Sequence, residues 1–183
     1  SLTCMLREAS RKPHPDVLYP TLLKPARHNY PEFIDEQGQS VSTGGARVLP
    51  VVDRGDIDQK QADPGPILGG STAGMFVRVD VWRRLGGFDP ALPLFRDGVD
   101  FGWRANEAGM VVRTAPSCTI HHRQAGRGWQ RESHLAPRPD VTDRLAGMRM
   151  VAARTGHPTR TSLALLVASV WRFLVLMVGK APS

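Results

Sequence analysis

Residues 67–122, ILGGSTAGMFVRVDVWRRLGGFDPALPLFRDGVDFGWRANEAGMVVRTAPSCTIHH, decide the fold class of this chain. Their β-branched and aromatic runs are typical of buried strands, and the segments between them carry helix signals. Asp80 suits the start of a short helix, and Gly86 with Gly87 suits its end. The predicted elements are a strand at 73–79, helices at 81–85 and 99–108, and strands at 110–116 and 117–122. This alternation predicts an α/β fold.

Upstream of this region, the chain predicts one helix and one further strand. Met5, Leu6 and Ala9 share one helical face, which the prolines of KPHPD end. Residues 17–25, VLYPTLLKP, have the apolar content of a buried strand. Residues 26–66 are polar and contain turn signals, and they are long for a loop within a compact domain. We therefore expect a hairpin or a functional loop there.

Downstream, the chain changes character twice. Residues 123–160 hold eight arginines against three acidic residues, and a helix is expected at 143–155. This segment has three interpretations: a solvated basic surface, a surface for anionic lipid headgroups, or a nucleic-acid surface. Residues 162–179 form an apolar run whose single charge is Arg172. A helix lying at the membrane interface is favoured, with Trp171 and Arg172 near the headgroups, while a membrane span and a buried helix stay open.

Composition limits the classes of protein and partner. The chain has 183 residues, a formal net charge of +7 and an isoelectric point of about 10.2, so anionic partners are expected. Nucleic acid is excluded as the main partner because no recognition motif is present and aromatic residues are sparse among the arginines. Cys4 and Cys118 are too few for a structural zinc site. No secretory signal is evident at the N-terminus, so both thiols are expected to be free in a reducing, cytoplasmic setting.

The ten residues 95–104, FRDGVDFGWR, place Asp97 and Asp100 three apart around a glycine. Two carboxylates at this spacing either cap and complement the start of a helix or serve as an acid–base pair. Asp97 precedes the expected helix on a turn, so it is the better candidate for a base. Asp100 falls within the first helical turn, where a charge complementing the helix dipole is the simpler role. Trp103 lies in mid-helix, which favours a place in the core.

Residues 69–122 resemble the second half of the catalytic domain of a family 2 glycosyltransferase. The resemblance rests on a strand of small residues, on GGFD after an arginine, on an acid before a helix, on RANEAG, and on a strand that ends in histidine. The positions that match are Arg78, Gly86, Gly87, Phe88, Asp89, Asp97, Arg104, Ala105, Ala108, Gly109, Pro116 and His122. The forms DFGWRA and DRGDIDQ are similar to those of large actinobacterial members.

The resemblance implies a partial GT-A fold: a mixed sheet with flanking helices, followed here by the apolar C-terminal helix. It implies a nucleotide-diphosphate sugar donor and a glycan acceptor of the cell envelope. It also implies Mg²⁺ or Mn²⁺, which would neutralise the leaving diphosphate, and a carboxylate that removes the acceptor proton. The expected units are a GT-A portion at 1–122, best matched at 67–122, an Arg-rich connection at 123–160, and the apolar helix at 161–183.

The resemblance assigns roles to particular residues. Asp97 and Asp100 become the catalytic candidates, although the position where the family's base usually stands is Gly98. His122 matches a histidine that contacts metal or diphosphate in some members, against the simpler reading of a strand-end histidine; His121 is expected to be structural. Candidates for contacting donor or acceptor are Arg78, Asp89, Arg104 and Trp129. Asp89 also suits a turn, the two arginines also suit structural roles, and Trp129 also suits membrane contact.

A departure from the family pattern leaves two functions open. The Asp-x-Asp motif that holds the metal belongs upstream of these residues, and Asp53, Asp56 and Asp58 come too late and resemble an acceptor-side loop. The chain is therefore expected to be the acceptor-side part of a transferase at the inner face of the plasma membrane, completed by a donor-binding half. The alternative is a catalytically incomplete remnant or split subunit that binds a membrane or a partner chain.

Overall fold

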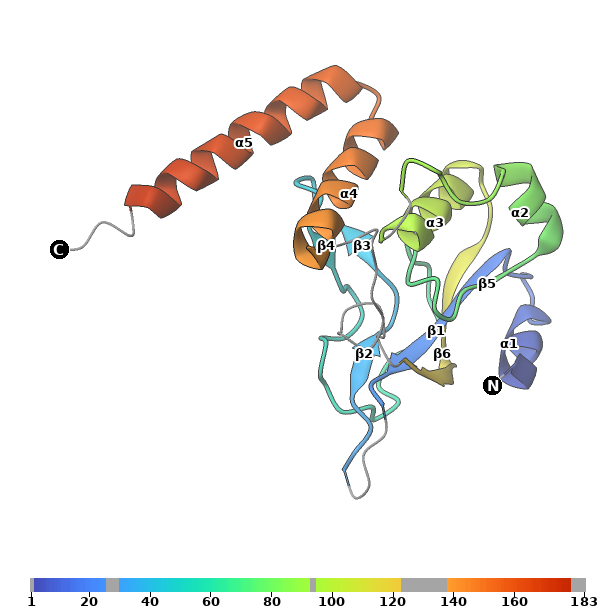
Figure 1. Cartoon of the computed structure of the whole chain (residues 1–183). Coiled ribbons are helices and arrows are strands. Elements are labelled where there is room, and N and C mark those ends of the chain that lie inside the picture. The colour runs from blue at the N-terminus through green and yellow to red at the C-terminus, as the bar shows by residue number, and fades with distance from the viewer. Residues whose placement is uncertain (1, 26–29, 93–94, 123–137, 179–183) are drawn as a thin grey trace.

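A computed structural model describes residues 2–25, 30–92, 95–122 and 138–178. Its centre is the strand β1 (Val17–Leu23), which is buried throughout. The strand β6 (Val112–His121) runs parallel to β1, while β2 (Ile34–Glu36) and β5 (Phe76–Val77) pair with it in the antiparallel sense. The result is a mixed sheet with helices around it (Figure 1), as the expected α/β class requires.

The order of residues in β1 explains its central position. VLYPTLL is an almost continuous apolar run, which suits a strand covered on both faces. Pro20 cannot donate a ladder hydrogen bond, and the register between β1 and β6 shifts directly after it. Residues 110–122 were expected to form two strands, but they form one strand with this irregularity. The strand expected at 73–79 shortens to the two half-buried residues of β5.

Two helices before and after the GGFDP turn cover the sheet. They are α2 (Val79–Leu85) and α3 (Asp97–Glu107), close to the expected ranges. Phe101 of α3 is fully buried, and its ring stacks on Trp82 of α2 at 5.2 Å. Tyr19 of β1 and Phe101 belong to one apolar cluster, which joins α3 to the sheet. The start of α3 is therefore held against the sheet by aromatic packing.

The polar segment before this region contains the expected hairpin. The strands β3 (Ser40–Val41) and β4 (Arg47–Val48) pair in the antiparallel sense. The helix α4 (Pro139–Arg154) packs on its turn, where an added Cβ on Gly147 would lie 2.1 Å from the carbonyl oxygen of Gly45. Two glycines thus let the backbones of hairpin and helix approach closely. This approach brings α4 over the start of α3.

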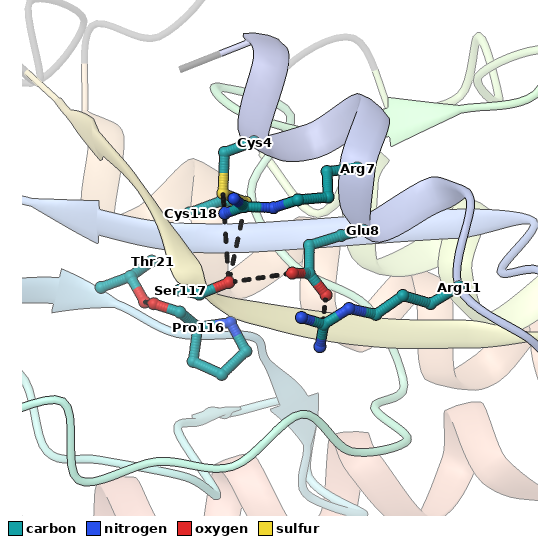
Figure 2. The surroundings of a disulfide bond; sticks show 8 residues. All are labelled: Cys4, Arg7, Glu8, Arg11, Thr21, Pro116, Ser117 and Cys118. Atoms are coloured by element: carbon teal, nitrogen blue, oxygen red, sulfur yellow. Dashed lines mark hydrogen bonds and ion pairs between the residues drawn. A yellow bond between two sulfur atoms is a disulfide. The ribbon is translucent and has the colours of Figure 1, made fainter.

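The first helix corrects the prediction of free thiols. In α1 (Leu2–Ala9), Cys4 forms a disulfide with Cys118 of β6, at a sequence separation of 114 residues (Figure 2). The prediction was wrong because it rested on compartment and number, whereas the pairing depends on α1 lying across β6. Disulfides are typical of oxidising compartments, so the cysteines give no support to a reducing, cytoplasmic setting. Glu8 and Ser117 add a hydrogen bond beside the bridge at 3.2 Å.

The last helix, α5 (Pro158–Val178), extends away from the rest of the molecule (Figure 1). Residues Pro158–Met177 have a mean hydropathy of 1.5, and 6% of the apolar window is buried. By length and composition this helix is able to cross a membrane. The apolar helix predicted at the C-terminus is confirmed, and a membrane-associated position is compatible with it.

Candidate active site

The start of α3 presents Asp97 on a turn of unusual backbone. Phe95 and Arg96 have positive φ angles of 61° and 62°, so the chain enters the helix through left-handed residues. Asp97 is the first helical residue and is half-buried. Its Oδ1 accepts a hydrogen bond from the N–H of Gly98 at 3.0 Å. Within the described residues Asp97 forms no ion pair, so no cation in that part of the chain holds its carboxylate.

The surroundings of Asp97 suit a proton acceptor. Burial raises the pKa of Asp97 above its usual range, and the negative charge of Asp100 adds to this. The N–H of Gly98 and the more distant charge of Arg47 act in the opposite direction. A carboxylate with a raised pKa is a stronger base than an ordinary aspartate, which is the adjustment that general-base catalysis at neutral pH requires.

Gly98 has no room for the second acid of the family pair. A Cβ at this position would lie 2.3 Å from the carbonyl oxygen of Gly70 and 3.1 Å from the backbone nitrogen of Thr72. The carbonyl of Gly98 also accepts a hydrogen bond from the buried hydroxyl of Tyr19 at 2.8 Å. The glycine is therefore required by the close packing of α3 on the loop at 69–72. The chain departs from the family pattern here for a steric reason.

Asp100 lies in a different environment, with no exposed surface. Arg104 Nε lies 2.8 Å from its Oδ2, and Arg154 Nε lies 2.7 Å from its Oδ1. Both carboxylate oxygens are thus occupied by guanidinium groups. This position suits a structural carboxylate better than one that exchanges a proton with substrate.

Two of the candidate contact residues belong to the same cluster as Asp100. Arg104 also donates to the carbonyl oxygens of Leu85 and Gly87, at 2.8 and 2.7 Å. Asp89 in the GGFDP turn pairs with Arg154 at 3.1 Å. These interactions tie the end of α2, the turn and α4 to α3. Arg104 and Asp89 thus stabilise the position of α3 through these interactions with α2, the turn and α4.

Arg78, another candidate contact residue, interacts with carboxylates other than Asp97. Arg78 is half-exposed and pairs with Asp16 and Asp80, at 3.1 and 2.7 Å. Asp80 lies in the first turn of α2, and the N-cap position that was expected for it belongs to Arg78. Trp129 lies outside the described residues. The exposed ion pairs of Arg78 contribute little to stability.

His122 ends β6 beside a buried acid. Its Nδ1 lies 3.0 Å from Oδ2 of Asp35, which is 2% exposed, and Arg54 lies 3.3 Å from the other oxygen of Asp35. This pair orients the imidazole and leaves Nε2 on the other side of the ring. Among the described residues, no three metal-ligating side chains cluster. The described part of the chain therefore offers one imidazole for a metal, which does not make a complete site.

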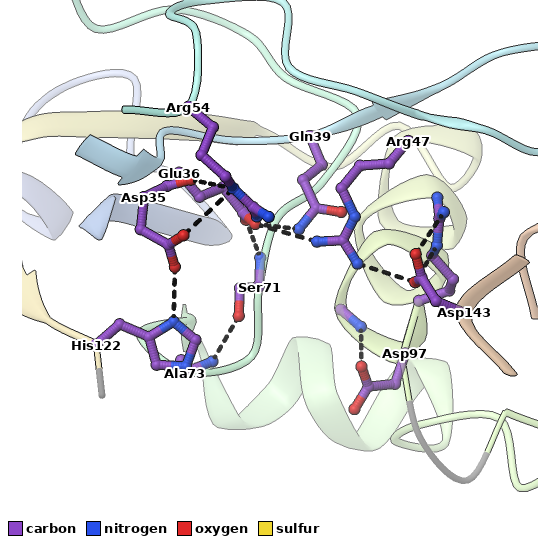
Figure 3. Close-up of polar contacts among 12 residues, drawn as sticks. Asp35, Glu36, Gln39, Arg47, Arg54, Ser71, Ala73, Asp97, His122 and Asp143 are labelled. Atoms are coloured by element: carbon purple, nitrogen blue, oxygen red, sulfur yellow. Dashed lines mark hydrogen bonds and ion pairs between the residues drawn. The ribbon is translucent and has the colours of Figure 1, made fainter. Parts of the chain in front are cut away.

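A buried chain of charges that the sequence analysis missed joins the His122 region to the start of α3 (Figure 3). Glu36 neighbours Asp35 in β2; its Oε1 accepts the N–H of Ser71 at 2.6 Å, and its Oε2 lies 3.4 Å from Arg47. Arg47 continues to Asp143 of α4 at 2.9 Å. Asp143 Oδ1 also forms an ion pair with Nε of Arg96, the residue before Asp97, at 2.7 Å.

The pKa values of Glu36 and Asp143 are shifted in opposite directions. Burial raises the pKa of Glu36 despite the nearby Arg47. Burial would also raise the pKa of Asp143, but the hydrogen bond and charge of Arg96, together with Arg47, hold it below its usual range. The signal in the sequence is the pair Asp35–Glu36, two acids inside a strand, because buried acids require partners. The partners themselves lie far along the chain and have no local signature.

Comparisons with known proteins agree with a glycosyltransferase relationship. No family model matches the chain. Over a match 145 residues long that covers 74% of this chain, it is 29% identical to N-acetylglucosaminyl-diphospho-decaprenol L-rhamnosyltransferase from two strains of Mycobacterium tuberculosis. The match spans 47% of the length of each relative, so the chain corresponds to about half of the curated proteins. The chain is thus similar to a rhamnosyltransferase that is named for a decaprenol-linked diphosphate substrate.

Proposed function

We propose that the chain is the acceptor-side part of a glycosyltransferase that extends a lipid-linked glycan of the bacterial cell envelope. The observation that carries the proposal is the condition of Asp97: a half-buried carboxylate with a raised pKa and no ion pair among the described residues. It lies in a chain that is similar to a transferase of this kind. Asp97 is the general base in this proposal.

The proposed reaction forms one bond and breaks another at a sugar carbon. The hydroxyl oxygen of the acceptor bonds to C1 of the donor sugar, and the bond from C1 to the nucleoside diphosphate breaks. The bonding electron pair leaves with the diphosphate, and the hydroxyl proton moves to the Asp97 carboxylate. The ion pair of Arg96 with Asp143 supports this step by fixing the turn before Asp97. Arg104 and Asp89 support the same turn through Asp100 and Arg154.

The donor side requires more than the described residues. Nucleotide sugar would bind in a half that corresponds to the uncovered length of the relatives, either in the same polypeptide or in a partner. A divalent cation, Mg²⁺ or Mn²⁺, would neutralise the leaving diphosphate when bound. His122 would supply one ligand, and the others would come from that half. The helix α5 would keep the protein at the inner face of the plasma membrane.

The second candidate function is a module that binds an acceptor, a partner chain or a membrane without catalysing transfer. The observation that favours it is Gly98, which stands where the resembled family usually has its base and where the packing leaves no room for a side chain. Both functions use the same helix α5 and the same sheet. They differ in whether nucleotide binds and whether Asp97 is needed.

The test measures nucleotide binding and sugar transfer by the purified chain in detergent. Isothermal titration with UDP and with GDP, each with and without Mn²⁺, reports whether a donor site is formed. Transfer from a panel of nucleotide sugars to a lipid-diphosphate glycan is then followed. For a catalytic chain, Asp97→Asn should lower kcat by about 10²–10⁴-fold with KM for the acceptor unchanged. Asp140→Asn, which changes an exposed carboxylate of α4, is the control. The same assays are repeated with the corresponding donor-binding half of a relative added. If neither binding nor transfer appears with that half present, the module remains as the function.

A further inference from the structure

A cavity lies between the β3–β4 hairpin and the helices α3, α4 and α5. Its volume is about 490 Å³, within the range of about 300–1,000 Å³ that is typical of ligand pockets. The apolar residues of its lining come from every one of these elements: Val41, Trp103, Val151, Ala164, Leu165 and Ala168. Val41 and Trp103 also pack on the apolar cluster that contains Val99 of α3. The cavity is thus an extension of the core under the start of α3.

One face of α5 forms a wall of this cavity. Thr161, Ala164, Leu165 and Ala168 all line it. At about 100° per residue, these four positions share one side of the helix, while Leu166 and Val170 lie on the opposite side. Alanines at the wall leave space that larger apolar side chains would fill. The cavity therefore depends on the sequence of this helix face.

The other faces of α5 indicate which molecules can reach the cavity. Leu166, Val170 and Phe173 are 59%, 51% and 61% exposed, on a helix long enough to cross a membrane. Such a surface is stable in contact with lipid chains rather than water. An apolar cavity that has this helix as its wall lies next to the source of long hydrocarbon chains. Its occupant should therefore be an apolar chain drawn from the membrane.

We propose that this cavity binds the isoprenyl chain of the lipid-linked acceptor. The proposal rests on the proposed function, which supplies a lipid diphosphate as the acceptor class. It commits to an isoprenyl chain rather than the acyl chains of bulk lipid, because α4 connects the cavity to the catalytic turn. Val151 of α4 and Thr155, the residue directly after this helix, line the cavity, and Asp143 of α4 holds Arg96 beside Asp97.

Charge at the junction of α4 and α5 suits the diphosphate of such a lipid. Arg160 directly precedes Thr161 in the cavity wall, and its side chain is exposed. His157 is exposed in the same junction. A guanidinium group at this place can pair with a diphosphate whose chain enters the cavity. The acceptor would then be held by its apolar chain and its head at adjacent sites.

The test uses a benzophenone-bearing farnesyl diphosphate as a photo-probe, with the full chain in phosphatidylcholine nanodiscs. Labelled peptides are located by mass spectrometry. The label should fall on residues 41–44, 151–155 and 161–168, and unlabelled farnesyl diphosphate should compete for it. Ala168→Trp should fill the cavity and weaken probe binding about tenfold or more. Leu166→Trp adds the same indole to the opposite face, so it should leave binding unchanged.

A second arm tests the head of the lipid. Arg160→Gln should weaken binding of farnesyl diphosphate about fivefold, in line with the loss of one cation near an anionic group, and should leave farnesol binding unchanged. Arg149→Gln removes another exposed arginine, on α4, and serves as the control. Equal effects of the two substitutions would overturn the role of Arg160.

The outcomes separate this inference from the proposed function. Labelling at the cavity that responds to Ala168→Trp, in a chain that transfers no sugar, would support the cavity and count against the transferase. No labelling at the cavity, or labelling spread evenly along α5, would overturn the cavity whether or not transfer occurs. Equal competition by a diacyl phospholipid would also overturn it, because the site would then be ordinary bilayer contact. Competition on the unmodified chain keeps the test valid if Ala168→Trp fails to fold.

Discussion

Asp97 and Asp100 lie three residues apart in one helix, yet they differ in solvent exposure and in the groups that bind their carboxylate oxygens. Asp100 has no exposed surface and binds two guanidinium groups, from Arg104 and Arg154. Asp97 is half-buried, accepts one backbone hydrogen bond, and has a pKa that burial raises. In the proposed function Asp97 is the reactive carboxylate, whereas Asp100 joins α3 to α4 through its ion pairs.

Spacing alone therefore does not identify an acid–base pair. Residues three apart lie on adjacent parts of a helix surface, but within the first turn of α3 Asp97 is half-buried and Asp100 is fully buried. The elements that decide the two environments are distant in sequence. Arg154 comes from α4, and the loop at Gly70 and Thr72 closes over Gly98.

The largest effect is expected from Asp100→Asn. The substitution leaves the guanidinium groups of Arg104 and Arg154 without their common anion, in a site where Asp100 is fully buried. Breaking a buried ion pair from one side costs about 3–5 kcal/mol of the free energy of unfolding. Urea denaturation followed by circular dichroism measures this loss. Asp140→Asn should change the midpoint little, and an equally small change for Asp100→Asn would contradict the comparison.

The next effect is expected from Gly98→Asp, which restores the acid of the family pattern. The new Cβ would approach the carbonyl oxygen of Gly70 to 2.3 Å, so α3 or the loop must move. Overpacking of this kind costs about 1–3 kcal/mol. Gly98→Ala introduces the same Cβ without charge and should cost a similar amount, as thermal unfolding of both variants would report. A faster transfer reaction by Gly98→Asp would mean that the position is a lost base after all.

Local patterns were enough to predict most of the framework. The apolar run of β1 and the helix of α3 follow from periodicity and helix signals, which act over short distances. For residues 26–66 the sequence predicted a hairpin or a functional loop, and the structure places a hairpin there between β3 and β4. The length of β5 was overestimated, because the β-branched and aromatic residues at 73–79 predicted a longer strand. In the structure β5 pairs with β1 over two residues only. The disulfide was missed because Cys4 meets Cys118 only after α1 crosses β6.

The candidate site was predictable in part for the same reason. Asp97 was identified because an acid before a helix is a local feature. Glu36, Arg47 and Asp143 were not, because their interactions join β2, the hairpin and α4 across the fold. The burial of Asp100 depends on Arg154, more than fifty residues later in the chain. From sequence, an acid inside a strand shows that a charged partner is needed. It does not show which distant residue supplies that partner.

The smallest effect is expected from Asp97→Asn on stability, and its dependence on pH gives the sharpest contrast with Asp100. Because burial raises the pKa of Asp97 above its ordinary value of 3.8 in the folded protein, folding favours the protonated form. The stability that this carboxyl contributes is therefore present below pH 3.8 and is lost as the pH rises through the raised pKa. Asparagine has no such dependence.

Asp97→Asn should thus be as stable as the natural chain at neutral pH or slightly more stable, by less than about 1 kcal/mol, since solvent screens a half-exposed group. The advantage of the variant should shrink as the pH falls toward 4, because the natural carboxyl then takes up its proton. Urea denaturation of both proteins from pH 4 to pH 8 measures the difference directly. If the variant instead loses stability relative to the natural chain as the pH rises, the folded carboxylate is held by a cation, and Asp97 is a structural residue like Asp100.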